Sequence, residues 1–386
     1  NIILVMEIKL NHTNLAKSLQ YTSRAVSAKP NIPVLSNVLL DISKNGLKLS
    51  ATNLDMGINV WIPGLVEREG KITVSAKFIS DFVSASSGDN VELKLEGSLV
   101  TVKTDKSKAN FNTIQSSEFP VLPEISETPL FKISAKEFMT SMDKVIFSCS
   151  TDMSIGKIQQ SGVLFELNKE DSEVIFVGLD GFRLSKRDAK VKELAEELPT
   201  EQIIVPAKYL AEVQKIASDY VDLDEIEVYL SKNNSQIIFK FEEIEFSIRL
   251  IEGPYPEYKR ILPDSASFTF EVKRGDLEDA IRVVNTFARS NLGYKTLFDL
   301  DLENSAIKLK SIVAEVGENE SVVNVTEVQA DTDLNTSYNL KFIQDVVSHI
   351  KGDTLVFETK GPLAASVFKD KSDARFIHLL MPLRRE

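Results

Sequence analysis

Cysteine and histidine are scarce in this 386-residue sequence. Cys149 is the single cysteine, which excludes an intrachain disulfide and a zinc cluster held by several thiolates. The three histidines, His12, His349 and His378, lie far apart and lack the spacing of metal ligands. We therefore expect no metal site, and the cytoplasm is the compartment that this cysteine usage favours.

Long apolar runs and catalytic motifs are also missing. No stretch approaches the roughly 18 apolar residues that span a bilayer. The short apolar run at residues 2–5 lacks the basic flank and the cleavage site of a signal peptide, and we leave residues 1–5 out of the fold prediction. The segment Gly178-Leu-Asp-Gly181 lacks the lysine and the spacing of a phosphate-binding loop, and no histidine lies near Cys149 in the sequence. The sequence thus predicts no catalytic site, no cofactor and no membrane segment.

An excess of basic charge is absent as well, because the net charge is −12. This value excludes a protein coated in basic surface, although it allows a basic surface confined to one place. Hydrophobic residues at 43% and charged residues at 26% are ordinary for globular protein, which excludes wholesale disorder. The length exceeds what one hydrophobic core supports and indicates two or three domains.

What the sequence does contain is an internal repeat. Six segments share one pattern, an alternating strand followed by a short amphipathic helix, and they start about 65 residues apart. In the first helix Leu15 and Leu19 lie on the apolar face, and Thr13 or Asn14 is the expected N-cap. The predicted strand and helix pairs are 6–10 with 14–26, 71–75 with 77–84, 131–134 with 136–147, 202–205 with 207–216, 267–272 with 275–288, and 337–340 with 342–350.

Proline-rich joints group these repeats in pairs. Such joints occur at residues 119–124 and 253–263, and a related Met381-Pro-Leu383 stands near the end of the chain. A single strand-rich unit with one helix cannot cover both faces of its sheet, so two units packed together are the plausible domain. The predicted fold is therefore α+β, with three similar domains at residues 6–125, 131–254 and 265–386.

Charge is distributed unevenly between the predicted helices and the rest of the chain. The helical segments carry thirteen basic and nine acidic residues, a net +4, which leaves −16 for the remainder. One explanation is that solvated helix faces simply carry mixed charge, which implies no binding function. The alternative is that equivalent helices face a shared polyanion. Six helices about 10 Å wide enclose a bore of only about 9 Å, whereas twelve enclose about 28 Å, enough for a DNA duplex. A two-fold dimer would supply twelve helices.

Several motifs, taken in order along the whole chain from Met6, resemble the bacterial β sliding clamp family, the processivity subunits of DNA polymerase III. They are Leu35-Ser-Asn-Val-Leu-Leu40, Ala51-Thr-Asn-Leu-Asp55, Phe119-Pro-Val-Leu-Pro123, Asp180-Gly-Phe-Arg-Leu184, Ile204-Val-Pro-Ala-Lys208, Tyr255-Pro-Glu-Tyr-Lys-Arg260 and Met381-Pro-Leu-Arg384. The resemblance implies a head-to-tail homodimeric ring of three similar domains per chain, with helices facing inward. It also implies a non-catalytic subunit of the polymerase holoenzyme. The ATP chemistry would belong to a separate clamp loader.

The same resemblance implies a cleft that binds short peptides with hydrophobic anchors. Phe182 stands where many relatives carry histidine, and the tail continues to Arg385-Glu386 where relatives often stop at a hydrophobic residue. The implied partners are the polymerase catalytic subunit, the clamp loader and other proteins with a clamp-binding motif. The implied cleft residues are Leu179, Gly181, Arg183, Leu184, Pro256, Arg260, Ile261, Asn339, Phe342, Leu363, Ala365, Leu380, Met381, Pro382, Leu383 and Arg384.

For double-stranded DNA the resemblance points to Lys29, Lys77, Lys157 and Lys208, and the helix charge adds Arg24. These residues would contact phosphates rather than base edges, because a sliding ring must be indifferent to sequence. Two other classes of protein remain open. One is an extracellular binding protein built of β repeats, which the missing signal peptide and cysteines disfavour. The other is an enzyme with a site between domains, which the scattered histidines disfavour.

Overall fold

The computed structural model describes residues 5–27, 31–154 and 156–384. The chain divides into two compact units. Unit 1 comprises the residues up to Lys136 with Val191–Pro199 and Lys208–Leu250. Unit 2 comprises Glu137–Lys190, Thr200–Ala207 and the residues from Ile251 onward. The segment expected as the central domain, 131–254, therefore contributes to both units.

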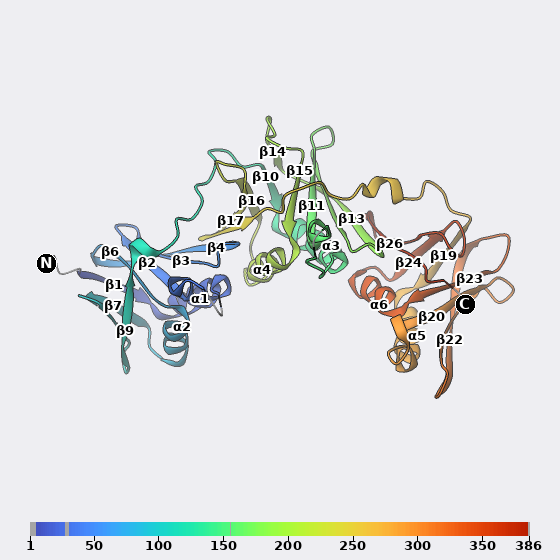
Figure 1. Ribbon diagram of the computed structural model, residues 1–386, viewed down its shortest axis with the longest axis horizontal. Coiled ribbons are helices and arrows are strands. Elements are labelled where there is room, and N and C mark those ends of the chain that lie inside the picture. The colour runs from blue at the N-terminus through green and yellow to red at the C-terminus, as the bar shows by residue number, and fades with distance from the viewer. Residues whose placement is uncertain (1–4, 28–30, 155, 385–386) are drawn as a thin grey trace. The chain divides into compact units, whose positions relative to one another are not determined.

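Unit 1 is built on a 14-stranded antiparallel sheet, drawn from blue to green in Figure 1 with a few yellow-green strands. Strand β18 pairs with β4, so this sheet continues from the expected central domain into the N-terminal one. In sheet order the strands are β14 (Glu193–Leu194), β10 (Phe131–Ser134), β16 (Glu225–Leu230), β17 (Gln236–Phe241), β18 (Ile244–Arg249), β4 (Met56–Ile62), β3 (Gly46–Thr52), β2 (Asn37–Ser43), β6 (Gly70–Ser75), β9 (Lys108–Gln115), β8 (Leu99–Lys103), β7 (Asn90–Glu96), β1 (Val5–Asn11) and β5 (Gly64–Arg68).

Unit 2 is built on a 12-stranded antiparallel sheet. Strand β13 pairs with β26, so this sheet joins the expected central and C-terminal domains. In sheet order the strands are β15 (Gln202–Pro206), β11 (Gly162–Asn168), β12 (Glu173–Leu179), β13 (Arg183–Lys190), β26 (Asp373–Leu380), β25 (Ser366–Asp370), β24 (Thr354–Thr359), β19 (Phe268–Lys273), β22 (Gly317–Gln329), β21 (Ala306–Val313), β20 (Lys295–Asp301) and β23 (Leu334–Asn339).

Six α-helices occur in the described residues, one in each predicted repeat. They are α1 (His12–Thr22), α2 (Ala76–Ala85), α3 (Ala135–Val145), α4 (Ala207–Ala217), α5 (Arg274–Ala288) and α6 (Leu340–His349). Short 3-10 turns accompany them: η1 (Ser23–Ala25), η2 (Pro33–Ser36), η3 (Ser116–Glu118), η4 (Ile146–Ser148), η5 (Ile158–Ser161), η6 (Tyr258–Ile261) and η7 (Leu292–Tyr294). None of the helices in the described part is long and apolar enough to cross a bilayer.

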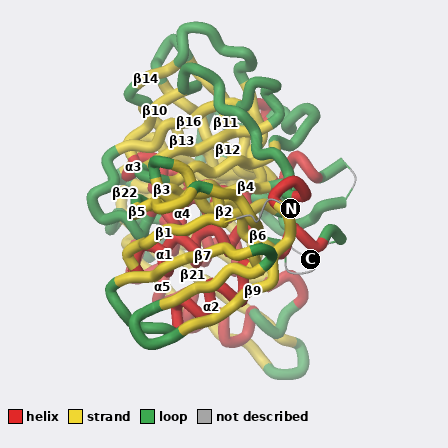
Figure 2. Tube along the Cα trace, turned by 90° about the vertical axis from the view of Figure 1, so that its left-hand side faces the viewer, coloured by secondary structure: helices red, strands yellow, loops and turns green. Residues whose placement is uncertain are grey.

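Each unit buries apolar residues that its helices and strands share. In unit 1, α1 contributes Leu15 and Leu19 and α2 contributes Ile79 and Val83 to one core with the N-terminal strands. Strands β1 and β7 cross the face nearest the viewer in Figure 2, with α1 behind them and in contact with both. In unit 2, α5 and α6 pack side by side over a core that contains several stacked phenylalanine rings.

The predicted strand and helix pairs are confirmed to within a few residues, because the periodicities that define them are local. The predicted N-cap of the first helix is wrong. Asn11 caps α1, and its Oδ1 accepts a hydrogen bond of 3.0 Å from the backbone N–H of Asn14. The helix thus begins at His12, two residues before Asn14, since the Asn11 side chain already accepts a hydrogen bond from a first-turn donor.

Candidate functional site

The predicted peptide-binding residues all lie in unit 2, and we call them the cleft surface. Part of this surface is the turn between β12 and β13. Gly181 has φ of +90° there, a backbone conformation that favours glycine. Asp180 holds the turn, because its Oδ1 accepts hydrogen bonds from the backbone N–H groups of Phe182 (2.9 Å) and Arg183 (3.0 Å). The turn is therefore a fixed platform that presents the exposed Phe182 ring.

Arg183 is one of the implied cleft residues, and the structure gives its side chain partners within the protein. The side chain is only 11% exposed, and its Nε donates to Asp180 Oδ2 at 3.0 Å. Its Nη1 donates to Asp345 Oδ2 of α6 at 2.6 Å. The guanidinium also lies 4.3 Å from the centre of the Phe342 ring, within the range of a cation–π contact. Arg183 thus ties the β12–β13 turn to α6.

The C-terminal residues form another part of the cleft surface. The Met381 backbone N–H donates to the Phe182 carbonyl oxygen at 2.9 Å, and the Leu383 N–H donates to the Ser337 carbonyl oxygen at 2.7 Å. Asn339 caps α6, with its Oδ1 accepting from the Lys341 N–H at 3.0 Å. The Asn339 amide N–H₂ group forms no hydrogen bond within the described residues.

A buried apolar cluster lies beneath these polar ties. It includes Leu179 and Leu184 of the cleft surface, with Ala365 packed at its edge. Two tyrosines that the sequence analysis missed, Tyr255 and Tyr258, belong to the same cluster and anchor the segment that carries Pro256, Arg260 and Ile261. The Tyr255 hydroxyl donates to the Val177 carbonyl oxygen at 3.1 Å. Leu380 belongs to the neighbouring core, on the other face of its strand.

Large apolar side chains stay exposed on the cleft surface, namely Ile261, Leu363 and Met381. Several large apolar side chains exposed in one region are typical of an interaction surface. Arg260 is exposed too and forms an ion pair of 2.7 Å with Glu257. Pro382 and Leu383 are half-buried, and Arg384 is exposed. The structure thus offers apolar anchors with a basic rim.

The candidate DNA-binding residues are placed less uniformly. In unit 1, Lys77 is exposed in the first turn of α2, and the Lys208 ammonium lies 4.4 Å from the centre of the Tyr209 ring. Arg24 forms an ion pair of 2.7 Å with Glu212. Glu212 lies one turn after Lys208 on α4. In unit 2, Lys157 is exposed but pairs with Asp152 at 3.2 Å. Lys29 lies outside the described residues.

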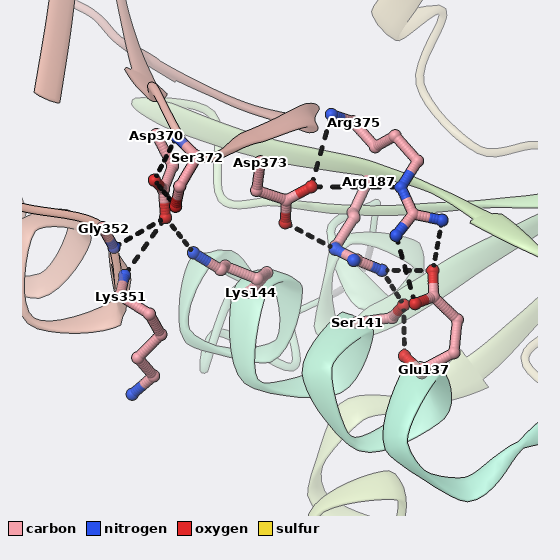
Figure 3. Close-up of polar contacts among 10 residues, drawn as sticks. All are labelled: Glu137, Ser141, Lys144, Arg187, Lys351, Gly352, Asp370, Ser372, Asp373 and Arg375. Carbon is pink, nitrogen blue, oxygen red and sulfur yellow. Dashed lines mark hydrogen bonds and ion pairs between the residues drawn. The ribbon is translucent and has the colours of Figure 1, made fainter. Parts of the chain in front are cut away.

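The sequence analysis missed a cluster of buried and half-buried charges between α3 and the β25–β26 hairpin, drawn in Figure 3 and called here the buried charge cluster. Lys144, counted above among the basic helix residues, forms a buried ion pair with Asp370 at 3.2 Å. It is therefore not available to face a polyanion. Glu137, Ser141 and Lys144 occur at positions i, i+4 and i+7 of α3, a polar stripe that could have signalled the cluster.

The other members of this cluster are arginines and their carboxylate partners. Arg187 Nη1 donates to Glu137 Oε1 and to Ser141 Oγ, both at 2.8 Å, and its Nε donates to Asp373 Oδ2 at 3.1 Å. Arg375 Nη1 lies 2.9 Å from Glu137 Oε1. With Lys144 and Asp370, the cluster holds three cations and three anions, so its charges balance.

Titratable groups in this region are perturbed by burial. Burial raises the pKa of the Cys149 thiol, which therefore does not supply a thiolate nucleophile. Burial lowers the pKa of His378 well below its usual value, with the Arg183 charge acting in the same direction. Within the described residues no group of histidine, cysteine, aspartate and glutamate side chains has the arrangement of a metal site.

Comparisons with known proteins cover the whole chain. Three family models match in order: the N-terminal domain of the DNA polymerase III beta subunit at residues 6–123, its central domain at 132–257 and its C-terminal domain at 259–384. A beta sliding clamp of Staphylococcus epidermidis is 26% identical, over 98% of this chain and 100% of that protein.

Solved structures show the same fold. A DNA polymerase sliding clamp from Bacillus subtilis superposes with a TM-score of 0.91 at 22% identity, over 99% of this chain and 100% of that chain. A DNA polymerase III beta chain from Streptococcus pneumoniae gives a TM-score of 0.90 at 22% identity, over 98% and 100%. The expected α+β fold of three sheet-rich domains is thereby confirmed.

Proposed function

The chain belongs to the family of DNA polymerase III beta subunits, the bacterial beta sliding clamps, and on this premise we propose that it is a non-catalytic processivity factor. Two copies form a head-to-tail ring that encircles duplex DNA in the cytoplasm and slides without sequence preference. The ring tethers the polymerase catalytic subunit, the clamp loader and other proteins that carry a clamp-binding peptide. The observation that carries this proposal is the ordered match of three family models from residue 6 to residue 384.

Two unpaired strand edges support self-association. Residues 108–112 of β9 pair with β8 on one side and with no described strand on the other, and no residue of β9 is buried. Residues 317–324 of β22 likewise pair only with β21 within the described part of the chain. Free edges are templates for pairing with another chain, so one copy's β9 can extend the sheet of another copy's β22.

The charges at these two edges have opposite signs. Lys103, Lys106 and Lys108 are exposed at the β8–β9 hairpin, which we call the basic edge. Glu315, Glu318 and Glu320 are exposed at the β21–β22 hairpin, which we call the acidic edge. Like edges repel and unlike edges attract, which favours head-to-tail contacts over head-to-head ones. Two such contacts close a ring of two copies.

Exposed apolar side chains accompany both edges. At the basic edge, Phe111 of β9 lies edge-to-face with Phe82 of α2 at 6.0 Å, and Phe78 of the same helix is exposed. At the acidic edge, Val283 and Ile312 are exposed, and Asn319 Nδ2 donates to the Val283 carbonyl oxygen at 2.9 Å. Apolar contact flanked by complementary charge is typical of a stable interface.

Lys77 and Lys208 support contact with phosphates, because neither forms an ion pair within the described residues. Arg24 and Lys157 are weaker candidates, since each would have to leave its carboxylate partner. A few phosphate contacts give weak, salt-dependent and sequence-independent attraction, which suits a ring that slides. Retention on DNA then depends on ring closure rather than on affinity.

The cleft surface supports tethering. Ile261, Leu363 and Met381 offer apolar anchors, and such anchors supply most of the binding energy in peptide recognition. A polymerase held by one peptide to a closed ring cannot diffuse away from the template. Its dissociation becomes an intramolecular event with a high effective concentration for rebinding.

Light scattering of the purified chain tests self-association. We expect a mass of twice 43.1 kDa at micromolar concentration, with dissociation promoted by high salt because charged edges are screened. A mass of 43.1 kDa at low salt would count against the ring.

A further inference from the structure

Strands β13 and β26 form a seam between two segments of unit 2 that are far apart in sequence. Five residue pairs run along it, from Arg183 opposite Leu380 to Arg187 opposite Phe376. The Arg183 end carries the cleft surface and the Arg187 end carries the buried charge cluster. Antiparallel strands rise about 3.4 Å per residue, so the two features lie roughly 14 Å apart along one ladder.

Three alternate residues on one face of β13 each have a polar partner from the C-terminal segment. Arg183 donates to Asp345 at 2.6 Å, and Arg187 donates to Asp373 at 3.1 Å. Between them, Ser185 Oγ lies 2.8 Å from His378 Nδ1, and both residues are fully buried. These pairs occur at every second residue, the spacing of one strand face.

Beside this row, Lys144 and Asp370 are almost fully dehydrated. Asp370 Oδ2 also accepts hydrogen bonds from the backbone N–H groups of Lys351 at 3.1 Å and Gly352 at 3.3 Å. A side chain at Gly352 would place its Cβ only 2.3 Å from Asp370 Oδ1, so the loop after α6 is packed directly on this carboxylate. Asp370 therefore joins α3, the α6 loop and the β25–β26 hairpin (Figure 3).

Apolar packing alone does not determine the register of this seam. A slip of one residue would exchange the two faces, but a slip of two residues would keep apolar side chains on apolar faces. The buried polar pairs distinguish these registers, because a two-residue slip moves Arg187 by about 7 Å relative to Asp373. Such a slip would leave the buried Arg187 charge without its Asp373 partner, which is strongly unfavourable.

We propose that Arg187 of β13, and Lys144 of α3 and Asp370 of β25 beside the seam, are positioning residues that set the register of β13 on β26 and thereby the spacing of the cleft surface. Arg187 donates to Glu137 and Ser141 of α3, and Lys144 binds the same helix to the β25–β26 hairpin. Leu179 and Leu184 come from one side of the seam, and Phe342, Leu380 and Met381 come from the other. The inference rests on the proposed peptide-binding role of the cleft surface, although none of the three positioning residues lies in it.

The test combines a register readout with a binding readout in the full-length chain. A Lys186→Cys and Ile377→Cys pair occupies directly opposite positions, and oxidation yield reports the native register. Lys144→Met is introduced into this background, with Lys136→Met as the matched control, since Lys136 is exposed on the same helix. A fluorescein-labelled peptide from the clamp-binding segment of the replicative polymerase reports affinity.

We expect Lys144→Met to lower the cross-link yield and to weaken the peptide roughly two- to thirtyfold, while Lys136→Met changes neither. If Lys144→Met does not fold, the double variant Lys144→Met with Asp370→Asn replaces it, since that variant removes both charges. We expect the same lower cross-link yield and weaker peptide binding. Native cross-linking or unchanged affinity, in Lys144→Met or in the double variant that replaces it, would overturn the inference. Failure of the unsubstituted chain to bind the peptide would instead overturn the cleft assignment, and the cross-link result would still decide the register.

Discussion

Lys144 of α3 and Asp370 of β25 form an ion pair in which Nζ lies 3.2 Å from Oδ2, and the two side chains are 2% and 1% exposed. The two residues are 226 positions apart in the chain. The Lys144 ammonium also lies 4.6 Å from the centre of the Phe376 ring. Because both charges have lost their water, each depends on the other and on the surrounding donors.

We predict that Lys144→Met destabilises the chain by about 3–5 kcal/mol, because Asp370 stays buried without its cation. Urea unfolding followed by circular dichroism measures this change. Lys136→Met, on the exposed side of the same helix, is expected to change stability by less than about 0.5 kcal/mol. Equal stability of the two variants would show that the pair is not energetically coupled to the fold.

The pH dependence of stability reports on Asp370 separately. Burial alone would raise the pKa of this carboxyl, but hydrogen bonds from Ser372 and from the Gly352 N–H, with the Lys144 charge, outweigh burial and lower the pKa to about 2. A carboxyl with a lowered pKa in the folded state stabilises the fold above its unfolded value of 3.8, and this contribution is lost as the pH falls toward 2.

We therefore predict that the unsubstituted chain loses about 2 kcal/mol more than Asp370→Asn between pH 4 and pH 2. Unfolding titrations at several pH values in this range test the difference. Parallel pH profiles for the two proteins would mean that Asp370 titrates normally.

Charge reversal tests the proposed ring interface. One variant replaces Lys103, Lys106 and Lys108 by glutamate, and the other replaces Glu315, Glu318 and Glu320 by lysine. Each alone places like charges together, and we predict that its dimerisation weakens about a hundredfold or more. Light scattering or sedimentation measures the mass.

The mixture of these two variants is the control, because a substitution that only destabilises the fold would not be rescued by mixing. In a head-to-tail ring of one copy each, the acidic β8–β9 hairpin meets the basic β21–β22 hairpin, and the remaining two hairpins keep their native pairing. We expect the mixture to regain a dimer mass. Monomers in the mixture would contradict the edge assignment.

Truncation of the C-terminal anchors tests the cleft surface. We predict that Met381→Ala with Leu383→Ala weakens a polymerase-derived peptide roughly ten- to hundredfold, because apolar anchors dominate such interfaces. The dimer mass is expected to stay the same. Met153→Ala, an exposed methionine outside the cleft surface, serves as the matched control in the same fluorescence anisotropy titration. Unchanged affinity in the double variant would remove these residues from the site.

Sequence patterns predict what is local in this molecule. Alternation and helical periodicity locate the six strand and helix pairs, because the spacing that identifies Leu277 and Ile281 as one buried stripe is also what packs them. The N-cap prediction for the first helix was wrong because Asn11 is both the last residue of strand β1 and the cap of helix α1. Motif resemblance predicts the cleft surface, and the Arg183 contacts show that one of its expected residues is engaged within the protein.

Long-range polar pairing could not be predicted. The polar stripe of Glu137, Ser141 and Lys144 sets Lys144 apart from an exposed helix lysine such as Lys136, but it does not identify the partner. That partner, Asp370, belongs to a hairpin of a different predicted domain. The same holds for Arg187 with Asp373 and for Ser185 with His378. Charge counting along helices therefore overstated the basic surface, because buried and paired cations were included.

Retention on DNA of defined topology tests the central claim most directly. The chain is loaded onto nicked circular DNA with a clamp loader and ATP, separated from free protein, and followed before and after the circle is cut once. If the ring is closed, the protein stays on the circular DNA in high salt. After the circle is cut, the protein slides off the DNA ends and is lost rapidly. Equal retention on circular and linear DNA, or release from the circle by salt alone, would contradict topological linkage.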